Sequence, residues 1–139
     1  MLFDVDSYAK FERFNIAEVD KKFFVTDFNM YSLKRGLEII GKREQKIEMT
    51  KILFSGNMLK AEEDYLNFLS ANYSIKWDKD KIYFPFDCED MMAIMENQRT
   101  SKITLKNLSI QYKEGIFHIT QQILLEAKQS DLKRIVKNI

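Results

Sequence analysis

The sequence predicts a single α+β domain over residues 1–139, in which an antiparallel sheet built from hairpins carries helices mainly on one face. Three observations lead to this fold class. Strand-like segments come in pairs joined by short polar turns, and segments with one apolar helical stripe alternate with these pairs. The composition is 45% hydrophobic with only four Gly and one Pro, which is typical of an ordered chain without linkers.

The first 41 residues predict a helix, a strand and a second helix. Aromatic residues at helical spacing around Phe11 indicate the first helix, and residues 22–28 (KFFVTDF) are rich in strand formers. The second helix is expected to begin after Asn29 or Ser32, which are both good capping residues, and to end at Gly41. Its apolar stripe consists of Leu33, Leu37 and Ile40.

The middle of the chain predicts a strand followed by a long helix. Residues 47–54 (IEMTKILF) alternate between apolar and polar at first and then become apolar, as in a strand that enters a core. Residues 58–73 have apolar side chains on one side, including Leu66, and acids near the N-terminal end, where the helix dipole favours negative charge. We expect Leu66 and Trp77 to be core residues.

The second half predicts two hairpins. Residues 74–86 have apolar residues alternating on either side of the polar stretch 78–81, and Pro85 suggests an edge position. Residues 102–123 have strand-like character on either side of a short turn that contains Gly115.

Two further helices follow from capping residues. Asp87 is expected to cap a helix with Met91, Met92, Ile94 and Met95 on its apolar side. Ser130 is expected to cap a C-terminal helix. The apolar stripe of that last helix consists of Leu132, Ile135, Val136 and Ile139.

Charge and hydropathy exclude several classes of protein. Lys plus Arg number 22 and Asp plus Glu number 21, so a net charge of +1 creates no long-range field toward a polyanion. No apolar run approaches the 18 or more residues of a membrane span, and the N-terminal segment lacks the basic residues of a signal peptide. We therefore expect a cytoplasmic protein that does not bind membranes, and the lone Cys88 fits a reducing compartment.

The chain contains few groups suited to catalysis, and we expect that it is not an enzyme. His118 is the single histidine, and no nucleophile motif flanks it or Cys88. A small hydrophobic role is commoner for such a Cys than a reactive one. No ligand spacing for a metal and no Gly-rich phosphate loop occurs, so we predict no metal, no catalytic residues and no cofactor.

An apolar and aromatic inventory remains, and it favours protein recognition. Aromatic residues make up 13% of the chain and seven Met are present. Met91, Met92 and Met95 are the candidate partner-binding residues, although filling the gap between their helix and the sheet is an equally good interpretation. The expected function is a non-enzymatic protein-binding module: an assembly subunit, an adaptor or an inhibitor. Self-association is a related possibility. Its Lys-, Asn-, Ile- and Phe-rich composition would suit a phage or an AT-rich bacterium.

The alternative is a nucleic-acid-binding regulator that uses a local basic patch. Lys34, Arg35, Lys42 and Arg43 are close together in the sequence, as phosphate contacts require. Glu38 interrupts the run, so a solvated helix face is the simpler explanation of the same residues.

Overall fold

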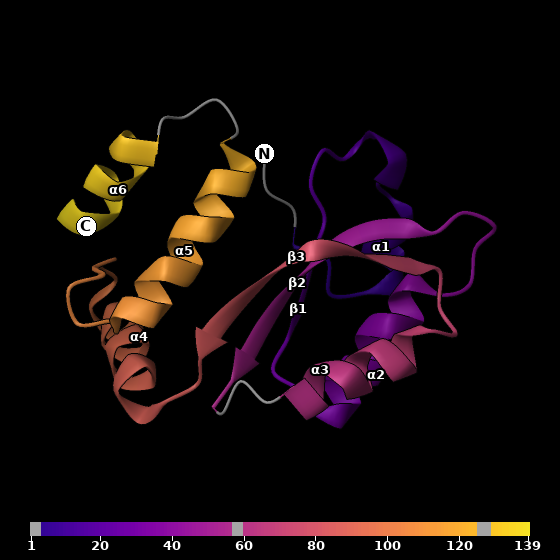
Figure 1. Ribbon diagram of the computed structural model, residues 1–139, viewed down its shortest axis with the longest axis horizontal. Helices are drawn as coiled ribbons and strands as arrows, with labels where there is room; N and C mark the ends of the chain where they lie inside the picture. Colours follow the sequence, from indigo (N-terminus) through magenta and orange to yellow (C-terminus); the bar gives the residue numbers. More distant parts are fainter. Residues whose placement is uncertain (1–3, 57–59, 125–128) are drawn as a thin grey trace. The chain divides into compact units, whose positions relative to one another are not determined.

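The structure is a computed structural model that describes residues 4–56, 60–124 and 129–139 (Figure 1). The helices are α1 (Tyr8–Glu12), the 3₁₀ turn η1 (Ile16–Glu18), α2 (Met30–Ile40), α3 (Lys60–Ser70), α4 (Cys88–Thr100), α5 (Ile110–Ile123) and α6 (Gln129–Asn138). The strands are β1 (Phe23–Thr26), β2 (Ile47–Ser55) and β3 (Ile75–Pro85). None of the described helices is long and apolar enough to cross a membrane.

The chain divides into two compact units. The first unit comprises Met1–Leu53 and Leu59–Lys81, and the second comprises Phe54–Met58 and Ile82–Ile139. Strands β2 and β3 therefore begin in the first unit and end in the second. The single domain expected from the sequence stays a prediction.

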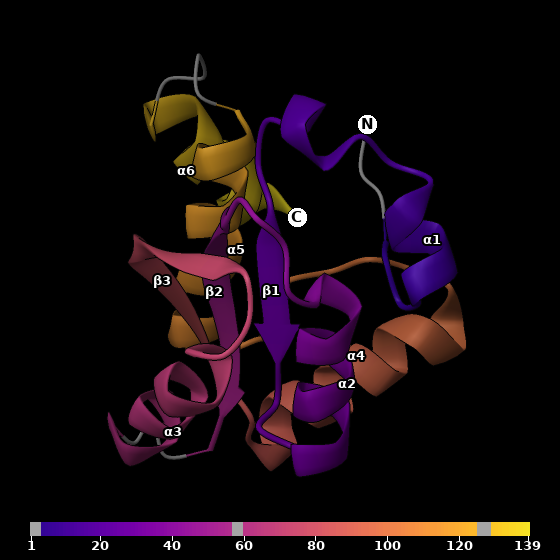
Figure 2. The ribbon, with the colours of Figure 1, turned by 90° about the vertical axis from the view of Figure 1, so that its right-hand side faces the viewer.

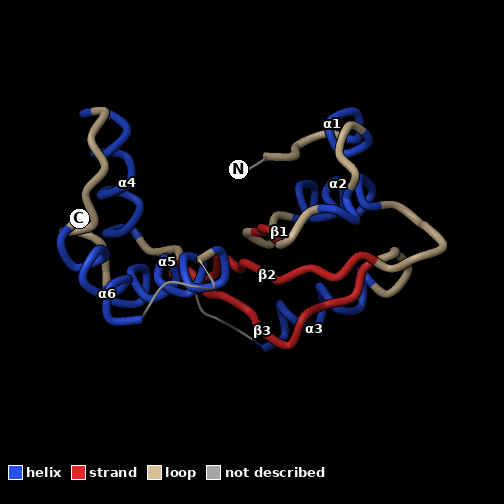
Figure 3. The backbone as a smooth tube through the Cα atoms, turned by 90° about the horizontal axis from the view of Figure 1, so that it is seen from above, coloured by secondary structure: helices blue, strands red, loops and turns tan. Residues whose placement is uncertain are grey.

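The three strands form one parallel sheet in the order β1-β2-β3, which Figure 3 shows from above. Strand β1 pairs with β2 from Phe23 opposite Thr50 to Thr26 opposite Leu53. The amide of Ile47, at the start of β2, donates to the carbonyl that precedes β3, with an N···O distance of 2.8 Å. A parallel sheet needs a long connection between neighbouring strands, and α2 and α3 supply the two connections.

The predicted antiparallel sheet is therefore wrong. Residues 74–86, expected to form a hairpin, are almost entirely the single strand β3. The polar residues 78–81 resemble a turn in the sequence, but they lie within this strand, and Lys79, Asp80 and Lys81 are exposed. Strand β3 is at the edge of the sheet, where charged side chains are favoured because they discourage pairing with another chain.

The second predicted hairpin, residues 102–123, is also wrong. Ser109 caps a helix: its Oγ accepts from the amide of Tyr112 at 3.1 Å, and α5 continues to Ile123. Gly115 lies inside α5 and is not a turn residue. A Cβ at this position would lie 2.7 Å from Cε1 of Phe84, so the absence of a side chain lets the helix approach the aromatic ring.

The predicted helix after Asn29 is confirmed as α2. The Asn29 side chain accepts from the amides of Tyr31 and Ser32 at 3.1 and 3.2 Å, and Gly41 ends the helix with a φ of +66°. The three residues of the predicted stripe are buried. Strand β1 and strand β2 also occur where the sequence predicts them.

Helices α2 and α3 cover the same face of the sheet. Phe24 on β1 lies against Gly36 of α2, with its ring atom Cζ 3.1 Å from the position a Cβ would take. The same ring meets the edge of Trp77 on β3, with centroids 5.5 Å apart, and the Trp77 Nε1 donates to Oγ of Ser70 in α3 at 2.8 Å. Figure 2 shows α2 beside β1 and α3 below β3.

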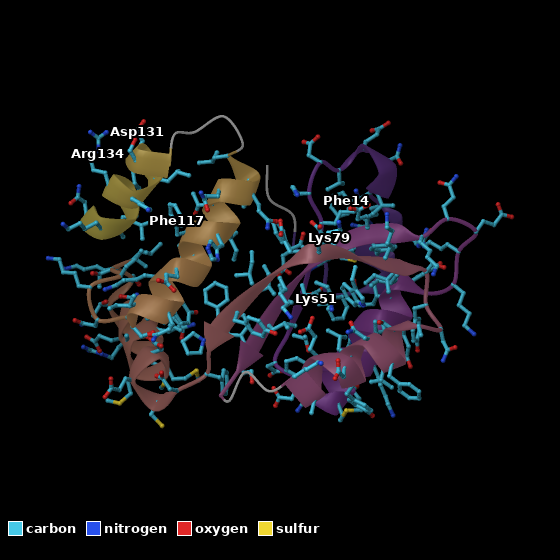
Figure 4. The ribbon with its side chains drawn as sticks, viewed as in Figure 1. Phe14, Lys51, Lys79, Phe117, Asp131 and Arg134 are labelled. Carbon is cyan, nitrogen blue, oxygen red and sulfur yellow. The ribbon has the colours of Figure 1, made fainter. Side chains whose placement is uncertain are left out.

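A buried ammonium group fixes α3 to the central strand. Lys51 on β2 has a side chain only 6% exposed, and its Nζ lies 2.9 Å from Oε1 of Glu63 and 2.7 Å from Oδ1 of Asn67 (Figure 4). The Trp77 ring centroid is 5.2 Å away, and Lys81 pairs with the second oxygen of Glu63. Because burial of a charge costs several kcal/mol unless it is paired, these contacts make α3 and the sheet interdependent.

We expect Glu63→Ala to lower the free energy of unfolding by about 3–5 kcal/mol, because it leaves the Lys51 charge buried without its carboxylate. Chemical denaturation measures this loss. The double variant Lys51→Met/Glu63→Leu, which removes both charges, should lose less. The control Asp64→Ala changes an exposed acid on the same helix and should stay within about 0.5 kcal/mol of the parent. A small loss for Glu63→Ala would contradict this account.

We expect Gly115→Ala to lower the free energy of unfolding by up to about 2 kcal/mol. Overlap of the new methyl group with the buried Phe84 ring costs about 1–3 kcal/mol, and the gain of about 1 kcal/mol that Ala normally gives in a helix interior offsets part of this cost. Gln111→Ala, at an exposed position of α5, is the control and should change stability by less than about 0.5 kcal/mol. Stabilisation by Gly115→Ala would show that the ring yields freely.

Candidate protein-binding surface

Three methionines form an exposed apolar stripe on α4, here called the methionine stripe. Met91, Met92 and Met95 are 38%, 70% and 62% exposed. Their spacing places them on neighbouring turns of one side of the helix. Their exposure gives no support to the interpretation that they fill a gap between their helix and the sheet. The three methionines stay candidates for partner binding.

The inward side of α4 has polar residues beside the half-buried Ile94. Asp90 is 1% exposed and Asn97 is half-buried, whereas the large apolar residues of the stripe face outward. The helix begins where the sequence predicts, because the Asp87 side chain accepts from the amide of Asp90 at 2.9 Å. A helix normally turns its apolar side toward the core, so α4 needs a specific reason for the reverse orientation.

Asp90 supplies the first part of that reason. Its two carboxylate oxygens accept from the backbone amide and the hydroxyl of Ser109, each at 2.7 Å. The same hydroxyl oxygen caps α5 by accepting from the Tyr112 amide. One carboxylate therefore joins the first turn of α4 to the first turn of α5, and hydrogen bonds to a charged acceptor are the stronger kind.

Asn97 supplies the second part, two turns further along α4. Its amide nitrogen donates to the Thr104 carbonyl at 2.9 Å, and its Oδ1 accepts from the Thr104 amide at 3.3 Å. The loop after α4 is thereby held against the same side of the helix as Asp90. These two polar anchors fix the rotation of α4, and the methionine stripe faces outward as a result.

Tyr112 belongs to an aromatic cluster and is affected by the charge of Asp90. Tyr112 lies 4.8 Å from Phe84, which stacks on Phe54 at 4.9 Å between ring centroids. Burial raises the pKa of the Tyr112 hydroxyl, and the negative charge of Asp90 raises this pKa further. Both effects favour the neutral phenol, as expected beside a carboxylate that stays in place as an anchor.

The sequence did not identify these anchors as parts of the site. The sequence assigned no functional role to Asp90 or Asn97. The available signal was the seven-residue separation of Asp90 and Asn97, which places two polar groups on one side of a helix that has methionines on the other. Asn97 gave no indication of its partner, because Thr104 contributes only backbone groups.

The other candidate groups for chemistry are dispersed. Cys88 is exposed at the start of α4, and His118 is exposed on α5 and not on the strand that the sequence predicts. No cluster of three or more His, Cys, Asp or Glu side chains suited to a metal occurs among the described residues.

The basic residues named by the nucleic-acid alternative have different surroundings. Lys34 and Lys42 line one depression between α2 and α3 together with Glu38, and Arg35 is exposed on α2. The other guanidinium, of Arg43, lies 2.7 Å from Oε1 of Glu12. The nucleic-acid-binding alternative stays a prediction. Of its four residues, the structure brings Lys34 and Lys42 together.

Further contacts engage Arg43 within the first unit. Its guanidinium carbon lies 4.7 Å from the centroid of the Phe11 ring, and its Nε donates to the Ile40 carbonyl at 3.1 Å. These contacts join α1 to the end of α2. The role of the side chain is therefore at least partly structural.

Comparison with known proteins gives no relative for this chain. No protein family, curated protein or solved structure matches it. The site is therefore argued from its own geometry.

We expect Asp90→Ala to lower the free energy of unfolding by about 1.5–3 kcal/mol, because two donors of Ser109 lose a charged acceptor. Glu89→Ala is the matched control, since it removes a neighbouring exposed carboxylate from the same turn. Urea denaturation of both variants measures the difference. Equal stability of the two would contradict the anchoring role of Asp90.

Proposed function

We propose that this protein is a non-enzymatic protein-binding module that contacts a partner protein through the methionine stripe of α4. The observation that supports the proposal is the reversed orientation of this helix, in which Asp90 faces inward and the three methionines are exposed. Natural selection for stability alone does not require three exposed methionines on one helix. Exposed apolar patches provide the energy of association, so the methionine stripe suits a binding surface.

The chemistry of the stripe suits protein recognition. Methionine is unbranched and polarisable, so it adapts to an irregular apolar partner. Complete burial of one such side chain contributes about 1.5–3 kcal/mol, so a few of them are enough for the energetic centre of an interface.

Charged residues frame the stripe. Glu96 and Arg99 lie on α4 and are exposed, with Nη2 of Arg99 2.6 Å from Oε1 of Glu96. Hydrogen bonding from this guanidinium lowers the pKa of the Glu96 carboxyl, so both groups are charged at neutral pH. Interfaces commonly have this arrangement of an apolar centre and a polar rim. The partner we propose accordingly has an apolar groove. A cytoplasmic location belongs to the same proposal, since the thiol of Cys88 is free and exposed beside the stripe.

A photo-crosslinker tests the proposal. Replacing Glu89 by a benzophenone amino acid places the reactive group next to the stripe without altering a methionine. In cells of the source organism, we expect one defined adduct with a second protein, identified by mass spectrometry. The variant Met91→Gln/Met92→Gln/Met95→Gln should lose this adduct and should bind the purified partner at least about tenfold more weakly.

The control is Ile103→Gln, which removes an exposed apolar side chain, 84% exposed, from the same unit but outside α4. It should leave the adduct and the affinity unchanged. An adduct that survives the triple substitution would refute the proposal. Adducts scattered over many abundant proteins would refute it as well, and an adduct of the chain with itself would assign the stripe to self-association.

A further inference from the structure

The second unit contains a cleft that neither the methionine stripe nor its anchors use. It lies between α5 and α6, and its volume is about 280 Å³. Its apolar walls include Leu105 from the loop before α5, Phe117 from α5 and Val136 from α6. Figure 4 shows Phe117 between these two helices. Three segments that are separate in the sequence therefore build one apolar cleft.

The lining of the cleft is rich in basic residues. Lys106, Lys113, Lys133 and Lys137 line it, and among the described lining residues Glu114 is the one acid. The chain as a whole has a net charge of only +1. Positive charge is therefore concentrated at this cleft. The sequence did not predict this concentration, because the four lysines occupy three separate segments.

The lysine side chains retain donors for a ligand. Nζ of Lys133 lies 5.8 Å from the centroid of the Phe117 ring, and Nζ of Lys113 donates to the carbonyl of Lys106 at 3.2 Å. An ammonium group has three donors, so Lys113 keeps two after this bond. Lysine stems pack along apolar walls while their charged ends stay near solvent, which places the charges at the mouth.

The walls of the cleft are fixed at the end of α6. The main-chain oxygen of Ile139 accepts from the amide of Leu105 at 3.3 Å and from the hydroxyl of Thr104 at 3.1 Å. Leu132 is 2% exposed and buries the inner side of α6. These contacts hold α6 beside the loop before α5, so the cleft is a defined feature of the second unit.

We propose that this cleft binds a small anionic amphiphile, with its hydrocarbon tail between α5 and α6 and its acidic head among the lysines. A free phosphate would leave the apolar walls exposed to water. A volume of about 280 Å³ is near the lower limit of small-molecule sites. Straight-chain carboxylates of about ten carbons have the required combination of a compact tail and a single negative head.

The test uses decanoate, octanoate and decanol with the full chain, at concentrations well below micelle formation, by isothermal titration calorimetry. We expect one saturable site for decanoate. Octanoate is two CH₂ groups shorter and should bind about fifteenfold more weakly, because each CH₂ group buried in the cleft tightens binding about fourfold. Decanol has the same tail without the charge. It should bind at least about tenfold more weakly than decanoate.

Charge reversal identifies the site. Lys133→Glu/Lys137→Glu changes two exposed residues of α6 at the mouth and should weaken decanoate binding at least about tenfold. Lys102→Glu is the control, since Lys102 is exposed in the same unit but does not line the cleft. Circular dichroism checks the helix content of each variant, and if the double variant loses helix, Lys106→Glu on the preceding loop replaces it.

Three results would overturn the proposal. They are the absence of saturable decanoate binding, equal affinity for decanol, and affinity that survives reversal at the mouth. The methionine stripe is a separate surface, so the triple methionine variant should bind decanoate normally, and failure of one proposal leaves the other unaffected.

Discussion

The parallel pairing of β1 with β2 is the constraint on which the first unit depends. Two neighbouring parallel strands cannot be joined by a tight turn, so each connection must cross a face of the sheet. Right-handed crossovers between strands in the order β1-β2-β3 place both connecting helices on the same face. That face must accommodate Phe24, Lys51 and Trp77 from the three strands, and Lys51 brings a charge into it. The carboxylate of Glu63 on α3 makes this burial tolerable.

The sequence predicted the local elements of the first unit better than their pairing. The cap at Asn29, the stripe of α2 and the stop at Gly41 are local signals, and the structure confirms them. Pairing depends on long-range contacts that such patterns do not contain. The stretch 78–81 illustrates the difficulty, because four charged residues read as a turn whether they join two strands or lie on an exposed edge strand. In α5, Gly115 reads as a turn residue, but its purpose is contact with the Phe84 ring.

The candidate sites show the same division between local and long-range information. Methionines at 91, 92 and 95 were recognisable as a group because they are adjacent on one helix. Their exposure was not predictable, since it depends on the hydrogen bonds of Asp90 with Ser109, nineteen residues away. The cleft between α5 and α6 was not predictable either. Its lysines belong to a loop and two helices, and residues 102–123 were expected to form strands, which would have placed the side chains of Lys106 and Lys113 differently.

The methionine stripe and the cleft between α5 and α6 both depend on where the second unit places its polar groups. In α4, Asp90 faces inward and the methionines face away from the core. Burial of the Asp90 carboxylate is tolerated only when its hydrogen-bond partners are in place, so its bonds to Ser109 fix this orientation. At the other surface, apolar walls are left open between α5 and α6 and the charges lie at the mouth. A core that used the methionines and closed the cleft would bury more apolar area and would be more stable. Both exposed surfaces therefore keep this unit below the stability that its composition allows, a cost that functional sites commonly carry.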